Sequence, residues 1–237
     1  MYKVIVALVA VILFSSCTDN KPTENEVLIT GNIKGLKKGK LYIQRVQDST
    51  LVALDTIILN GTSAFESKVQ LDSPEMLYLY VDRGQTNSID NNLLFFAEPG
   101  KINIDTNLEF FLAEAKVTGS KNQELYDQYK GIISKFNDQQ LELLQAQVLG
   151  QKGSKNYSAE ENSKKQDALL KRRYLYAANF ALTNADHEVA PYIALTDIYD
   201  MQPRYLDSIH SKMTPKVLKS KYGKKFTEFL KQQKEVK

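Results

Sequence analysis

Cys17 is the only cysteine in the chain of 237 residues, and its surroundings are those of a lipid attachment site. A single positive charge at Lys3 precedes an apolar stretch from Val4 to Phe14, and two serines come directly before the cysteine. This order is typical of a cleaved secretory signal, and the apolar stretch is too short to span a bilayer. We therefore expect a signal peptide at residues 1–16 and a thioether-linked lipid on Cys17. The alternative is a signal peptide followed by an incidental cysteine.

Lipidation of Cys17 would leave no free thiol in the mature chain. Disulfide exchange needs an attacking thiolate and a leaving sulfur, so a thiol-disulfide oxidoreductase activity is excluded. Two or three acyl chains would hold the protein on its membrane, because each buried methylene contributes about 0.8 kcal/mol. We expect a lipid-anchored protein of the bacterial cell envelope, on the outer membrane and facing the periplasm. Exposure on the cell surface stays open.

The two histidines offer little further chemistry. His187 follows Asp186 in a stretch that should connect two helices, and His210 stands apart. A histidine beside an aspartate can serve acid-base or metal chemistry, but such residues more often cap and pair at helix ends. A zinc site also needs further ligands at suitable spacing. We predict no metal site.

The acidic residues give no sign of a hydrolytic pair. Asp72, Glu75 and Glu98 stand beside prolines or turns, where acids are common. Nothing in their placement indicates paired catalytic carboxylates, and the sequence has no Gly-x-Ser-x-Gly elbow. The glycines between residues 31 and 39 lack the Gly-Lys-Ser/Thr ending of a phosphate loop and are interpreted as a turn. We predict no catalytic residue, no cofactor-binding residue and no cofactor.

The charge balance also limits the function. Lysine and arginine number 31 against 28 aspartates and glutamates, and such a balance argues against a dedicated nucleic-acid binder. Nine lysines nevertheless stand between residues 212 and 237. We interpret them mainly as the solvated face of a last helix, and the alternative is a patch for acidic partners or lipid headgroups.

The elements that would position these residues begin after a polar tether, residues 17–26. Short apolar runs with turn signals fill residues 27–118, without helical patterns between them. Met76 to Val81 and Leu93 to Ala97 have the composition of buried strands, and Asn60-Gly61 is typical of a type I′ hairpin turn. Eight or so strands at this spacing predict an antiparallel β-sandwich.

The pattern changes to a helical period after residue 118. Ser120 with Gln123, and Ser158 with Glu161, form the capping boxes expected at two helix starts, and shorter helices follow. Thr214 caps a last helix at 216–234. We therefore predict an all-helical region at 119–237 and an α+β fold.

Thirteen tyrosines and no tryptophan make tyrosine the main aromatic residue. Tyrosine is favoured at interfaces and ligand clefts, but here it must also build the core. We favour core packing and keep a recognition surface as the alternative. If the protein has a groove, the boundary between sandwich and helices is its expected place.

Several stretches resemble the uncharacterised N-terminal domain that precedes thioredoxin-like domains in thiol-disulfide interchange lipoproteins of Bacteroidota-type bacteria. In the strand region they are Gly31–Leu36 with Gly39–Ile43, Leu93–Gly100, and Val117–Ser120 leading to Leu125 and Tyr126. In the helical region they are Val189–Tyr192 and Ser220–Lys224.

Longer members of that family continue into a domain with a Cys-x-x-Cys site, whereas this sequence stops at Lys237, so no redox residue is carried over. The resemblance implies a non-catalytic binding or accessory module, anchored to the membrane, for a separately encoded envelope protein such as a thioredoxin-like protein. One alternative is a hydrolase-like enzyme of unrecognised type with a site between sandwich and helices. Another is a vestigial, truncated redox lipoprotein. Any small ligand stays open.

Overall fold

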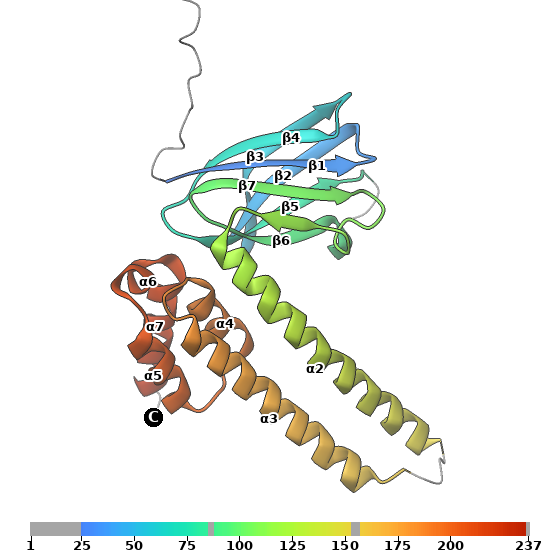
Figure 1. Ribbon diagram of the computed structural model, residues 1–237, viewed down its shortest axis with the longest axis vertical. Coiled ribbons are helices and arrows are strands. Elements are labelled where there is room, and N and C mark those ends of the chain that lie inside the picture. Colours follow the sequence, from blue (N-terminus) through green and yellow to red (C-terminus); the bar gives the residue numbers. More distant parts are fainter. Residues whose placement is uncertain (1–24, 85–87, 153–156, 236–237) are drawn as a thin grey trace, which may run out of the picture.

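The computed structural model describes residues 25–84, 88–152 and 157–235. The predicted signal peptide, Cys17 and all but the end of the tether lie outside these residues. Strands occupy the first part of the described chain and helices the second, so the predicted α+β class is confirmed (Figure 1).

Two four-stranded sheets form a sandwich, with strand orders β4-β1-β7-β8 and β3-β2-β5-β6. Alternate side chains of both sheets point inward and make a core of valine, isoleucine, leucine and phenylalanine. The strands are β1 (Glu26–Lys34), β2 (Lys38–Gln47), β3 (Thr50–Asn60), β4 (Ala64–Gln70), β5 (Glu75–Asp82), β6 (Asn92–Ala97), β7 (Gly100–Asn107) and β8 (Lys116–Thr118).

One pairing departs from the predicted antiparallel arrangement. β1 and β7 run parallel, with Val27 opposite Gly100 and Lys34 opposite Asn107. Parallel neighbours need a long connection, and here β2 to β6 form it, including the whole second sheet. The sandwich is therefore mixed, and its other five pairings are antiparallel.

The turn at Asn60-Gly61 does not close a hairpin. It carries the chain from β3 in one sheet to β4 in the other, and only Gly61 of the two residues has a positive φ, 98°. The two-residue hairpin lies instead between β2 and β3, at Asp48 (φ 46°) and Ser49 (φ 68°). Positive φ at both central residues is what a type I′ turn requires.

The stretches Met76–Val81 of β5 and Leu93–Ala97 of β6 lack charged residues because their side chains pack on two sides. Leu77, Leu79 and Phe95 point into the sandwich, whereas Met76 and Phe96 belong to the core of the helical region. These two strands are thus the surface on which the helices pack.

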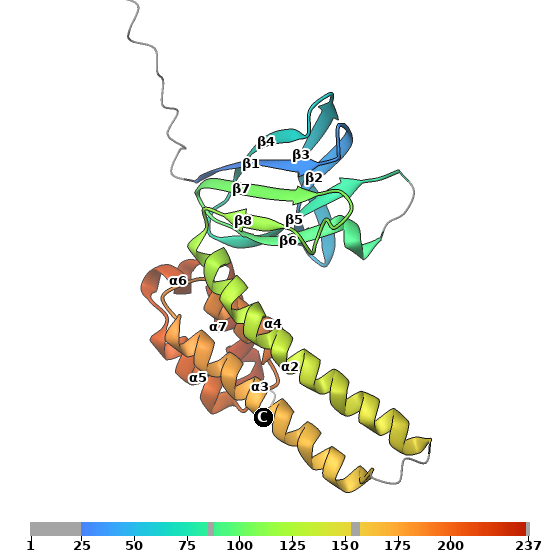
Figure 2. The ribbon, with the colours of Figure 1, turned by 45° about the vertical axis from the view of Figure 1, so that its right-hand side comes forward.

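The helical region begins with a long hairpin of two helices. In both views α2 and α3 extend away from the sandwich, and α4 to α7 gather beside the half of the hairpin nearer to it (Figures 1 and 2). None of the helices in the described ranges is long and apolar enough to cross a membrane. The helices are α2 (Lys121–Gln151), α3 (Ala159–Thr183), α4 (Val189–Asp197), α5 (Pro203–Lys212), α6 (Pro215–Lys219) and α7 (Lys221–Glu235), and a short 3-10 helix, η2 (Ile89–Asn91), precedes β6.

The last predicted helix is in fact two helices. Thr214 caps α6 as expected, with its hydroxyl accepting from the Val217 amide at 3.4 Å. Ser220 then leaves the helical conformation, with ψ 169°, and its hydroxyl accepts from the Gly223 amide at 3.1 Å. Because Ser220 ends one helix and caps the next, α6 and α7 meet at an angle that a single helix could not make.

Candidate functional site

The first turn of α2 is hydrogen-bonded to the sandwich. The Ser120 hydroxyl accepts from the Gln123 amide at 3.0 Å, as predicted. The Gln123 side chain does not return to Ser120, because its Oε1 accepts from the Phe96 amide at 2.7 Å and its Nε2 donates to Asp127. Half of the predicted capping box is therefore replaced by a bond that attaches α2 to β6.

Asn122 is the centre of a buried polar network at this junction. Its Nδ2 donates to Glu98 Oε2 at 2.7 Å and to Glu188 Oε2 at 3.0 Å, while its Oδ1 accepts from the Val189 amide at 2.8 Å. Glu98 also accepts from the Lys121 amide through its other oxygen. One amide side chain thus joins the loop after β6, the start of α2 and the start of α4.

Glu75 makes a second connection between the two regions. Its side chain is 4% exposed and pairs with Arg45 of β2 at 2.8 Å and with Lys221 of α7. Beside it, the Met76 amide donates to the Tyr222 hydroxyl at 3.0 Å, and the Lys221 amide donates to the Ser73 hydroxyl at 3.0 Å. A carboxylate held by two cations ties the sandwich to the last helix.

A polar pocket opens between these two connections, and we call it the seam pocket. Its volume is about 640 Å³, and its walls come from the first described residue, the loops before β5 and after β6, the starts of α2 and α4, and α6 with the Ser220 that follows it. Asn122, Glu188 and Ser220 are its buried polar residues, and Lys216 and Lys219 are exposed at its edge. The predicted place for a groove, the boundary between sandwich and helices, does hold a pocket.

Glu188 has an incomplete set of partners. It is 2% exposed, Asn122 donates to its Oε2, and its Oε1 has no hydrogen-bond partner. A buried polar atom without a partner carries the full cost of losing water, so such atoms are rare in folded proteins. This residue is the least satisfied group of the seam pocket.

The two histidines lie apart. His187 Nδ1 and Asp186 Oδ1 are 2.9 Å apart at the edge of the seam pocket, and the hydrogen bond from His187 lowers the pKa of the Asp186 carboxyl. His210 Nε2 and Thr227 Oγ1 are 2.9 Å apart, between α5 and α7. Over the described ranges, no group of three or more histidine, cysteine, aspartate or glutamate residues could hold a metal ion.

The structure gathers acids that the sequence leaves scattered. Asp72 and Glu98 line the seam pocket, and Glu75 lies against a neighbouring pocket with Lys224 and Lys225. Sequence reasoning missed Asn122 and Glu188, which are 66 residues apart and meet only in the fold. A polar residue on the inward face of α2 was the one available signal for Asn122.

Several tyrosines of the helical region pack as a connected cluster rather than as a surface. Phe96 and Tyr192 meet edge to face with ring centroids 5.7 Å apart, and Tyr129 stacks on Tyr176 at 5.9 Å. The Tyr129 hydroxyl donates to Asp197 at 2.6 Å. Burial, the largest cause, raises the pKa of the phenols above the ordinary value of 10, so they keep their protons in alkali that ionises a free tyrosine; these residues are Tyr126, Tyr129, Tyr174, Tyr176, Tyr192 and Tyr222.

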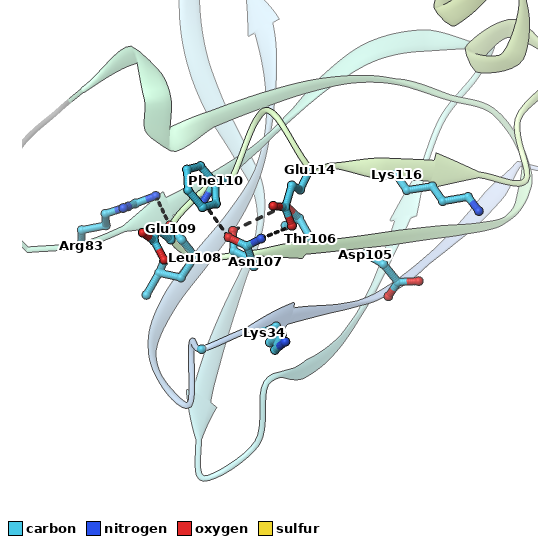
Figure 3. Close-up of a pocket in the computed structure, with 11 residues that line it drawn as sticks. Lys34, Arg83, Asp105, Thr106, Asn107, Leu108, Glu109, Phe110, Glu114 and Lys116 are labelled. Carbon is cyan, nitrogen blue, oxygen red and sulfur yellow. Dashed lines mark hydrogen bonds between the residues drawn. The ribbon is translucent and has the colours of Figure 1, made fainter.

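A second pocket, at the β7–β8 edge of the sandwich, is larger, about 920 Å³ (Figure 3). Its polar groups mostly hold one another: Arg83 donates to the Leu108 carbonyl at 2.7 Å, and Asn107 both donates to Glu114 and accepts from the Phe110 amide. These bonds fix the loop after β7. We therefore place the candidate site in the seam pocket, where a buried group is left unsatisfied.

Comparison with known proteins finds one family model that matches the sandwich region. Residues 27–126 match the model of a domain of unknown function, DUF4369. The match runs from β1 into the first turns of α2 and so includes Asn122 and Gln123. No curated protein matches the chain. An N-terminal domain of unknown function is thus shown, and the link to thioredoxin-like lipoproteins stays a prediction.

Proposed function

We propose that this protein is a membrane-anchored envelope lipoprotein that acts as a non-catalytic binding or accessory module for a separately encoded partner, such as a thioredoxin-like protein. The anchor is supported by the signal pattern that ends at Cys17. The binding role is supported by one structural feature, the distal half of the α2–α3 hairpin.

The distal half of this hairpin exposes apolar side chains. Leu141, Leu144 and Val148 of α2 are 56%, 44% and 50% exposed. Their spacing of three and four residues places them on one face of the helix, which we call the arm stripe. Clusters of exposed apolar residues on a soluble surface mark interaction sites more often than isolated ones do.

The distal half of the α2–α3 hairpin, which we call the arm, has little internal packing to explain its length. Residues 137–142 of α2 are all exposed, and in the first three turns of α3 only Asn162 and Leu169 are buried. A hydrogen bond of 3.2 Å between Gln166 and Gln147 is among the few contacts across this part. Covering three such side chains, which are already about half buried, would contribute about 1 kcal/mol each. The arm is therefore suited to a partner with an apolar face.

The enzymatic alternative has less support. Glu98, one of the carboxylates that line the seam pocket, accepts hydrogen bonds from α2 through both oxygens. Its geometry is that of a helix-start cap. The vestigial alternative differs from our proposal in that it expects no partner for the arm stripe.

The test is a cross-linked pull-down of the full-length protein from its own cells, read by mass spectrometry. Four forms are compared: the native chain, L141S/L144S in the arm stripe, I58S, and C17S. Ile58 is 72% exposed on β3 and provides a matched control for the loss of an exposed aliphatic side chain. Unchanged thermal melting of L141S/L144S would show that the arm still folds.

We expect one envelope protein to be enriched by the native and I58S forms and lost at least tenfold with L141S/L144S. Equal recovery with the native chain and L141S/L144S, or no enriched protein from a folded and lipidated chain, would reject the binding module. C17S tests the anchor separately, since this form should leave the detergent phase and lack lipid mass.

A further inference from the structure

We call Glu188, Glu98 and the Asn122 between them the floor of the seam pocket. This floor carries more negative charge than the neighbouring described residues balance. Glu188 and Glu98 share the amide of Asn122, and no described cation pairs with Glu188. The start of α4 directly after Glu188 offsets part of this charge through its helix dipole. It leaves Glu188 Oε1 without a donor.

A buried carboxylate oxygen in this state calls for a hydrogen-bond donor, preferably a charged one. Asn122 is already committed, because its amide protons go to the two glutamates and its oxygen accepts from Val189. Glu188 lines the seam pocket, but its Oε1 is screened from solvent, so a water or a ligand in the pocket becomes the missing donor once the carboxylate turns toward it. A primary ammonium group, with three donors and a positive charge, matches the floor better than water does.

The edge of the same pocket carries two exposed lysines as well as the exposed carboxylates of Asp72 and Asp186, and Asp186 pairs with His187. Lys216 and Lys219 are exposed on α6, and neither forms an ion pair with a described residue. They stand one helical turn apart, so both ammonium groups can lie over the opening. The volume of about 640 Å³ exceeds that of a single ion and suits a small organic molecule.

We propose that the seam pocket binds a small zwitterion, an amino acid or a short peptide, whose ammonium group lies on the Glu188 floor and whose carboxylate meets Lys216 and Lys219. This site is separate from the arm stripe and does not depend on the lipid anchor. The protein would then carry two recognition surfaces, a polar pocket at the seam and an apolar face on the arm.

The experiment is a binding titration of the full chain, labelled with nitrogen-15, against four probes at up to about 10 mM each. Triglycine carries both charges, N-acetyl-triglycine lacks the ammonium group, triglycinamide lacks the carboxylate, and glycine is the free amino acid. The backbone amide of Val189, which donates to Asn122, reports on the floor. The amide of Leu79, deep in the sandwich, is the reference.

We expect triglycine to shift the Val189 signal, and both blocked peptides to bind at least tenfold more weakly. Stronger binding of triglycine than of glycine would assign a peptide, and equal binding would assign a free amino acid. If N-acetyl-triglycine binds as well as triglycine, or if none of the probes binds, the proposal is wrong and water satisfies Glu188.

Two variants locate the charges. E188Q keeps an acceptor for Asn122 but removes the negative charge, so triglycine affinity should fall at least tenfold, while E228Q makes the same change on an exposed part of α7 and should have no effect. If E188Q fails to fold, K216Q/K219Q changes only exposed residues and should weaken triglycine but not triglycinamide. Unchanged triglycine affinity in K216Q/K219Q would contradict the assigned orientation.

Discussion

The sandwich and the helical region bury their cores in different ways. The sandwich core consists of aliphatic side chains and phenylalanine, with residues such as Leu77 and Phe95 fully buried. The helical core is rich in tyrosine, and its phenols reach partners on other elements, as Tyr129 does with Asp197. The sandwich therefore depends on non-directional burial, whereas the helical region also depends on hydrogen bonds that hold only while the phenols stay protonated.

The two cores meet at β5 and β6. Met76 and Phe96 lie on the outer face of these strands and pack into the helical core, while their neighbours Leu77 and Phe95 pack into the sandwich. A change on one face of these strands should thus act mainly on one region. Four substitutions test whether the sandwich and the helical region respond separately.

The largest effect is expected for F95A in the sandwich. Phe95 is fully buried, and replacing a buried phenylalanine by alanine costs about 4 kcal/mol through lost burial and the cavity left behind. Urea denaturation should show this loss in the free energy of unfolding. F110A, at an exposed position of the same domain, should change it by about 0.5 kcal/mol or less. A cost for F95A near that of F110A would mean that the sandwich core repacks.

The strands and helices were predictable from the sequence because their patterns are local. Ser120 marks a helix start by its own chemistry, and the alternation of Ile102 with polar neighbours marks a half-buried strand. The parallel partner of β1 was not predictable, since strand order depends on contacts about 70 residues apart. The hairpin at Asp48 and Ser49 was missed because neither residue is glycine, the usual signal for a positive φ.

The candidate site was predictable only as a place. Boundaries between packed units are common ligand sites, and this argument located the seam. It could not identify Glu188, because a glutamate that precedes a helix has the same sequence context whether or not it lines a pocket. Likewise, Gln123 fits a capping box in sequence, but its acceptor binds β6 in the fold.

G223A should lower the free energy of unfolding of the helical region by about 3 kcal/mol, nearly as much as F95A lowers that of the sandwich. A Cβ at Gly223 would lie 1.9 Å from the carbonyl oxygen of Val217, so α6 and α7 would have to separate. G131A is the matched control, because nothing lies within 4 Å of a Cβ there and alanine favours the helix by up to about 1 kcal/mol. The melting temperatures of G223A and G131A, followed by circular dichroism at the helix band, should therefore shift in opposite directions from that of the native chain. Similar melting of the two variants would show that the α6–α7 approach has no energetic importance.

E75Q tests how strongly the regions are coupled. Glu75 holds Arg45 and Lys221, and loss of its charge should cost about 2 kcal/mol, less than for a fully buried pair because both cations remain about a quarter exposed. Unfolding of the sandwich and of the helices should then separate into two transitions, read by the nuclear magnetic resonance signal of the buried Leu79 for the sandwich and by the helix band for the helices. E66Q, on the exposed face of β4, should leave them coincident. Coincident transitions in E75Q would assign the coupling to Met76 and Phe96 instead.

The smallest effect at neutral pH, about 1 kcal/mol, is expected for Y129F, which removes the hydrogen bond to Asp197. Its larger consequence appears in alkali. Burial raises the pKa of Tyr129 above 10, so the folded state retains a proton that the unfolded state loses above that pH. The stability that this phenol contributes is therefore complete below about pH 10 and is lost as the pH rises further. Between about pH 9 and pH 11, urea unfolding of the helical region should weaken more steeply in the native chain than in Y129F, and Y199F, at an exposed tyrosine, should behave as the native chain does. If alkali weakened the sandwich and the helices equally, the contrast between an aliphatic core and a tyrosine core would have no thermodynamic consequence.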